Sequence, residues 1–87
     1  MRIKLKIVND FFQRAAYDNE LEESYIALDT ACDIVENVIS ASPSAKQDAI
    51  FKLVNNLSQA ATYDYETKMW SVALGTACEI VLASQIF

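Results

Sequence analysis

The chain has 87 residues, 53% of them hydrophobic, and a formal net charge of -5. The length predicts one domain over residues 1–87, and the high hydrophobic share excludes a disordered chain. A single Gly and a single Pro leave little material for turns, which disfavours a β-sandwich or barrel, and the absence of His removes the usual neutral-pH base and the commonest metal ligand.

An internal repeat with an offset of 46 residues organises the chain. Residues 8–35 align without a gap on residues 54–81, and 14 of these 28 positions are identical. Composition alone accounts for about two matches, so the alignment indicates a duplicated supersecondary unit. We therefore expect two repeat units, 1–41 and 42–87, that fold alike and are related by a pseudo-twofold axis.

The first predicted element covers the N-terminal residues. Ile3, Leu5 and Ile7 alternate with charged residues, which is typical of a strand. The repeat-related residues 48–54 instead have the spacing of a helix, and on that ground we predict a helix here too. It ends near Tyr17 and Asp18, where Asp18 is a suitable N-cap for a second helix.

The second predicted element is a helix that follows Asp18 and continues to about residue 40. Its acidic first turn suits the positive end of a helix dipole. Apolar side chains recur at alternating intervals of four and three, which predicts a buried seam. The members of this seam are Leu21, Tyr25, Leu28, Cys32, Val35 and Ile39.

The third predicted helix begins after the only proline. Pro43 follows Ser42 as a first-turn proline follows a cap residue, while Ser44 and Gln47 offer an alternative capping box one step later. Apolar residues then recur with helical spacing over residues 50–61.

The fourth predicted helix follows Asp64 and repeats the small residues of the second. Ala73, Ala77 and Cys78 match the block around Ala31 and Cys32, and small residues allow two helices to approach closely. We expect these two blocks to cross at the centre of the molecule. The predicted fold is therefore all-α, a four-helix arrangement made of two tandem helical hairpins.

Negative charge is concentrated in residues 18–36, which contain seven acidic residues and no basic one. If this segment is helical, five of these acids lie within an arc of about 60° beside one tyrosine. Two interpretations remain open: a solvated surface, or a docking surface for a basic partner with the tyrosine as an aromatic anchor. The candidate partner-binding residues are Asp18, Glu22, Tyr25, Asp29, Asp33 and Glu36.

The remaining motifs argue against catalysis and membrane insertion. There is no Gly-rich phosphate loop and no Ser-His-Asp set, so we predict a protein without enzymatic activity, metal or cofactor. The acidic charge argues against nucleic-acid binding. No signal peptide or membrane span is recognisable, which predicts a cytoplasmic protein in which Cys32 and Cys78 are buried free thiols. Tyr65 and Trp70 are present in one repeat only and indicate either asymmetric packing or an exposed interface.

In general character, the chain resembles small cytoplasmic inhibitors such as immunity proteins of nuclease toxins, antitoxins and phage anti-defence proteins. The resemblance is one of class and carries no residues over. It implies a non-catalytic protein that binds and neutralises a basic protein partner, a toxin or nuclease. The alternative is a homo-oligomeric helical adaptor, such as a homodimer, joined through Trp70 and the C-terminal residues Ile86 and Phe87.

Overall fold

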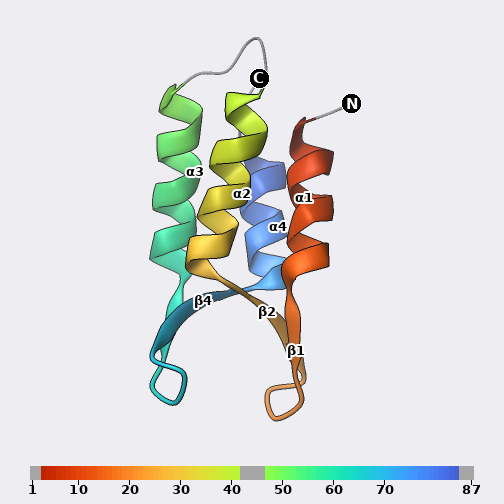
Figure 1. The fold of residues 1–87 in the computed structure, drawn as a ribbon, viewed down its shortest axis with the longest axis vertical. Coiled ribbons are helices and arrows are strands. Elements are labelled where there is room, and N and C mark those ends of the chain that lie inside the picture. The colour runs from red at the N-terminus through yellow and green to blue at the C-terminus, as the bar shows by residue number, and fades with distance from the viewer. Residues whose placement is uncertain (1–2, 42–46, 85–87) are drawn as a thin grey trace.

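The fold, seen in a computed structural model that describes residues 3–41 and 47–84, contains one helix–hairpin–helix unit in each repeat (Figure 1). The first unit comprises α1 (Ile3–Arg14), β1 (Ala16–Asp18), β2 (Glu23–Ala27) and α2 (Leu28–Ser40). The second comprises α3 (Gln47–Ala60), β3 (Thr62–Asp64), β4 (Met69–Ala73) and α4 (Leu74–Ala83). The fold is thus a mixture of helices and an antiparallel sheet, and the prediction of an all-α helical bundle was wrong.

The four strands form one antiparallel sheet in the order β1-β2-β4-β3. At its centre, Ile26 of β2 lies opposite Val72 of β4, and the flanking pairs are Tyr25 with Ala73 and Ala27 with Ser71. Because Val72 is the repeat equivalent of Ile26, the register is symmetric about this pair. The expected pseudo-twofold axis therefore passes between the two central strands. The two hairpins diverge from this axis at the end of the molecule opposite the start of α1 and the end of α4 (Figure 1).

The hydrophobic core follows the repeat closely. Eleven hydrophobic residues of the described part are buried, and ten of them form five repeat-related pairs. The equivalent of the eleventh, Ile39, is residue 85, which lies outside the described residues. The five pairs are Ile7 with Leu53, Phe11 with Leu57, Ile26 with Val72, Ala31 with Ala77, and Val35 with Val81.

The small-residue blocks of α2 and α4 do not cross as predicted. Within the described residues, α2 packs mainly against α1 and α3, and α4 packs against the same two helices. Ala31 and Ala77 are nevertheless fully buried. Both belong to the same core cluster as the larger Phe11 and Leu57.

The predicted first and third helices are confirmed as α1 and α3, and the alternating pattern of Ile3, Leu5 and Ile7 belongs to a helix. The proposed start signals Ser42, Pro43 and Ser44 lie outside the described residues. None of the helices in the described ranges combines the length and the apolar character that crossing a membrane requires.

The predicted helix caps at Asp18 and Asp64 are hairpin turns instead. Oδ1 of Asp18 accepts hydrogen bonds from the backbone N–H groups of Glu20 (2.9 Å) and Leu21 (3.2 Å). Oδ1 of Asp64 accepts from the backbone N–H groups of Glu66 (2.9 Å) and Thr67 (3.4 Å). An N-cap carboxylate binds the N–H groups two and three residues ahead in the same way. The aspartates therefore make the hydrogen bonds expected of a cap, but the element that follows each of them is a hairpin turn and not a helix.

Each of these turns ends at a residue with a positive backbone angle φ. Glu22 has φ 53° and Lys68 has φ 58°, the left-handed region that L residues rarely occupy. Each of the two residues lies four positions after the aspartate and directly precedes the returning strand. Each hairpin thus contains a non-Gly residue where glycine is the usual choice.

Replacing Asp18 or Asp64 by Ala is expected to lower the free energy of unfolding by about 1 kcal/mol, because two turn N–H groups lose their acceptor. Replacement by Asn should retain most of the stability, since the amide oxygen accepts the same bonds. Urea denaturation monitored by circular dichroism measures the effect. Unchanged stability in both Ala variants would contradict the role given to these carboxylates.

Candidate functional site

The six predicted partner-binding residues do not lie on one helix. Asp18 is in β1, Glu22 in the turn of the first hairpin, and Tyr25 in β2. Only Asp29, Asp33 and Glu36 are on α2. The continuous acidic stripe was therefore a wrong prediction, because its helical projection ran through residues 18–27, which form a hairpin.

The acids fall into two groups, one in the first hairpin and one on α2, which follows β2 directly. We call Asp18, Glu20, Glu22 and Glu23 the hairpin acidic group, and Asp29, Asp33 and Glu36 the α2 acidic face. Within the described ranges the single salt bridge joins Lys6 and Asp10 of α1, with 3.1 Å between Nζ and Oδ1. No described basic side chain is thus in a salt bridge with any of the seven acids.

The α2 acidic face is the solvent side of its helix. Its three residues are exposed and spaced by four and three, while Val35 and Ile39 on the opposite side are buried. Asp29 has a structural role as well, since it lies in the first turn of a helix whose N-cap residue, Ala27, forms no side-chain cap. Neither Asp33 nor Glu36 has such a role.

The repeat shows that the fold does not require this face. The residues of α4 equivalent to Asp29, Asp33 and Glu36 are Gly75, Glu79 and Leu82, so α4 retains one of the three charges. Like charges three or four residues apart cost a few tenths of a kcal/mol per pair. The second and third acids of α2 thus oppose folding slightly, and the fold does not explain their presence.

The three acids of the α2 acidic face affect the pKa of the Cys32 thiol. Its pKa is raised above the ordinary thiol value, first by burial and then by the negative charges of Glu36, Asp29 and Asp33. The pKa of Cys78 is raised by burial alone. Both cysteines are free and half-buried, which corrects the prediction that they are buried.

Two half-buried thiols at repeat-related positions, with different charge surroundings, provide a direct test. Neutralising the face with Asp29→Asn, Asp33→Asn and Glu36→Gln is expected to lower the pKa of Cys32, because the charges that disfavour its thiolate are gone. Cys32 should then react faster with a disulfide reagent at pH 8, while Cys78 keeps its rate. The rates are measured in single-cysteine variants over a pH series. An unchanged rate for Cys32 after neutralisation would contradict the influence of the three acids on its thiol.

Tyr25 lies in β2 beside the hairpin acidic group and not on the α2 acidic face. Its hydroxyl donates a hydrogen bond to Oε2 of Glu23 at 3.3 Å. Desolvation, followed by the charge and hydrogen bond of Glu23 and the charge of Asp18, raises the pKa of this phenol. Asp18 and Glu23 lie directly opposite each other across β1 and β2, a pairing of like charges that weakens a hairpin.

The second hairpin presents an aromatic cluster of Tyr63, Tyr65 and Trp70. The rings of Tyr63 and Tyr65 meet edge-to-face at 5.0 Å between centroids, and those of Tyr63 and Trp70 at 5.3 Å. Tyr65 is 84% exposed and Trp70 is 52% exposed. Of the two interpretations of these aromatics, the structure favours an exposed surface over asymmetric core packing.

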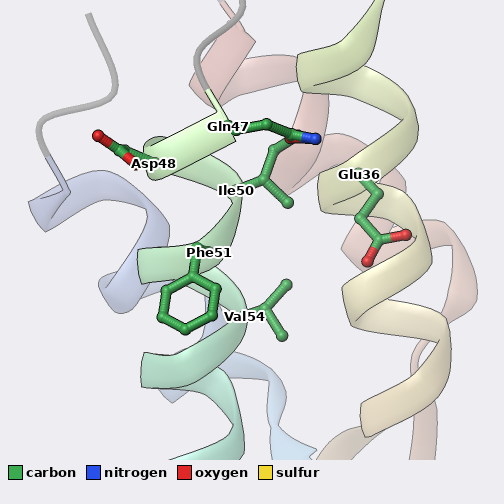
Figure 2. Close-up of a pocket in the computed structure, with 6 residues that line it drawn as sticks. All are labelled: Glu36, Gln47, Asp48, Ile50, Phe51 and Val54. Carbon is green, nitrogen blue, oxygen red and sulfur yellow. The ribbon is translucent and has the colours of Figure 1, made fainter.

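A groove between α2 and α3 lies beside the α2 acidic face. Its volume is about 380 Å³. Figure 2 shows Ile50 and Val54 on the side of α3 that faces α2, with Glu36 across from them on α2. The other lining residues are Gln47, Asp48 and Phe51. Glu36 is therefore shared between the α2 acidic face and this groove.

No protein-family model, curated protein sequence or solved structure matches this chain. Within residues 3–41 and 47–84, no three His, Cys, Asp or Glu side chains are arranged to hold a metal ion. The chemistry that remains on the surface is a set of exposed carboxylates beside an apolar groove, together with an aromatic hairpin. Such surfaces bind other macromolecules through charge and through a few large side chains.

Proposed function

We propose that the protein is a non-catalytic acidic inhibitor that binds and neutralises a basic protein partner in the cytoplasm. The observation that carries the proposal is the group of seven acids in residues 18–36, none of which forms a salt bridge with a described basic side chain. Exposed charges of one sign steer a partner of the opposite sign and raise the rate of association.

A nuclease toxin is the partner class that this surface fits best. Nuclease active sites are basic because they hold phosphate groups, so a surface of carboxylates can occupy the same cleft. The acids of α2 are exposed on a convex helix face, which suits insertion into a cleft better than enclosure of a substrate. This favours the role of an immunity protein or antitoxin over that of an enzyme.

The test is affinity capture of the tagged full chain from its source cells, followed by reconstitution with the purified partner. We expect a partner with a basic surface, a nuclease activity that falls as the protein is added in equimolar amount, and an affinity that falls steeply with salt. A stable complex with an acidic partner, or undiminished activity in the saturated complex, would contradict the proposal.

The aromatic cluster supports a second candidate, the homo-oligomeric adaptor. At about 200 Å² per aromatic side chain, the exposed fractions of Tyr63 (37%), Tyr65 (84%) and Trp70 (52%) offer about 350 Å² per protomer. A stable interface buries about 800 Å² per partner. The cluster alone is too small for a stable dimer, and Ile86 and Phe87, which were expected to extend it, lie outside the described residues.

Light scattering distinguishes the two candidates. We expect a monomer of 9.7 kDa in solution, and no change in mass on replacing Trp70 by Ala. A dimer that dissociates in the Trp70→Ala variant would favour the adaptor, with the acids as a solvated surface. The equivalent replacement in the first hairpin, Ser24→Ala, is the matched control.

A further inference from the structure

The groove between α2 and α3 has the chemistry of a receptor for a cationic side chain. Ile50 and Val54 form an apolar wall, both half-buried, and Glu36 provides a carboxylate on the opposite helix (Figure 2). Lysine and arginine bury their aliphatic stems along such walls and keep the charged group at the rim. A carboxylate at that rim forms a charge-assisted hydrogen bond, which is stronger than a neutral one.

The repeat supplies a second version of this site that is already filled. The pseudo-twofold axis relates the α2–α3 contact to the α4–α1 contact, where Lys4 replaces Ile50 and Leu82 replaces Glu36. There, Nζ of Lys4 donates a hydrogen bond to the backbone oxygen of Leu82 at 3.1 Å. At the α4–α1 contact, therefore, a lysine of the chain itself crosses from one helix to the other.

In the α2–α3 groove the corresponding lysine is missing and the acceptor is stronger. Ile50 ends short of where an ammonium group would lie, and Glu36 adds a carboxylate at the position of Leu82. Phe51, which is 75% exposed, adds an aromatic ring to the lining of the groove, and guanidinium groups stack on such rings. The same position in the fold thus offers space and charge for a cation from another molecule.

We propose that this groove receives an arginine or lysine side chain of the basic protein partner. The proposal rests on the proposed function and deepens it, because it identifies one pocket at the edge of the α2 acidic face. Glu36 belongs to both, so a partner that contacts Asp29 and Asp33 can place one cationic side chain in the groove.

The decisive variant is Ile50→Lys, which gives the α2–α3 contact the lysine that the α4–α1 contact has. The new ammonium group is expected to occupy the groove and to exclude a cation of another molecule. The fold should be retained, since Lys4 is accommodated at the equivalent α4–α1 contact. Gln59→Lys is the matched control, since it adds the same charge to the exposed side of α3 more than two turns away.

The probes are the N-acetyl methylamides of arginine, lysine and the uncharged arginine analogue citrulline. Each is titrated into the full ¹⁵N-labelled chain, and binding is followed by amide chemical shifts. We expect saturable shifts at Glu36, Ile50 and Val54 for one or both cationic probes, with a dissociation constant on the order of 1 mM, and none for citrulline. Affinity should fall at least fivefold in Ile50→Lys and stay unchanged in Gln59→Lys.

Shifts spread evenly over all the acidic residues, or equal affinity in the Ile50→Lys variant, would overturn the groove proposal. With the natural partner, we expect Ile50→Lys to weaken binding about tenfold. Reversing the charges of Asp29 and Asp33 should cause a larger loss of affinity. If charge reversal lowers the affinity and Ile50→Lys does not, the result contradicts the groove proposal and leaves the proposed function standing. No effect of either change contradicts the proposed function itself.

Discussion

Replacing Phe11 by Ala is expected to lower the free energy of unfolding by about 3–5 kcal/mol, the largest single effect in this chain. The Phe11 side chain is fully buried at the point where α1 packs into the shared core. Its removal loses apolar burial and leaves a cavity that the surrounding helices fill only in part. A domain of this size has about 5–10 kcal/mol of stability, so much of the total is at stake.

The neighbouring residue Phe12 provides the matched control. It is 61% exposed, and Phe12→Ala should change the stability by less than about 0.5 kcal/mol. The repeat equivalent of Phe11 gives a second comparison, since Leu57→Ala should cost about 2–5 kcal/mol. Urea denaturation measures all three. Similar effects of Phe11→Ala and Phe12→Ala would contradict the placement of α1 on the core.

Reversing the charges of Asp29 and Asp33 to Lys is expected to weaken the partner complex at least 100-fold, about 2.7 kcal/mol. The change replaces two attractions by two repulsions on the solvent side of α2 and also slows association. Asp29 lies in the first turn of α2, and its reversal should cost the free protein up to about 1 kcal/mol of stability. Titration calorimetry with the purified partner measures the affinity.

The repeat again provides the control. Glu79 on α4 occupies the position of Asp33 and is also exposed, and it is changed to Lys in the same way. We expect Glu79→Lys to leave the affinity within about threefold of the unmodified protein, because α4 lacks the other two acids of the face. Circular dichroism confirms that each variant keeps its helices. A complex unaffected by Asp29→Lys with Asp33→Lys would contradict docking through α2.

The repeat made much of the architecture predictable from the sequence. It predicted two similar units and their twofold relation, and the symmetric pairing of Ile26 with Val72 agrees with that relation. It also indicated that the alternating N-terminal residues are helical, as α1 is. Periodicity alone favoured a strand there, and the comparison with residues 48–54 was what corrected it.

The strands were missed because the turns contain no glycine. Glu22 and Lys68 adopt positive φ without it, so a composition with one Gly gave no warning of two hairpins. Asp18 makes the hydrogen bonds of a helix cap, and the acids after it are typical of a first helical turn. A weaker signal was present in the β-branched and aromatic residues of 23–27 and 69–73, which favour strands.

The candidate site was predicted in part. Asp29, Asp33 and Glu36 share one exposed face, because that portion of the predicted helix exists. Asp18, Glu22 and Tyr25 lie in the hairpin and could not have been placed without the strands. The groove depends on the contact between α2 and α3, which belong to different repeat units, and no spacing along the chain predicts such a contact.

The most direct test of the central proposal is a map of the partner interface on the ¹⁵N-labelled protein. Amide shifts and line broadening in the saturated complex report which residues are covered. We predict that the changes centre on Asp29, Asp33 and Glu36 and extend to Ile50 in the groove. Changes confined to Tyr63, Tyr65 and Trp70, with α2 unaffected, would contradict the proposal and assign binding to the second hairpin.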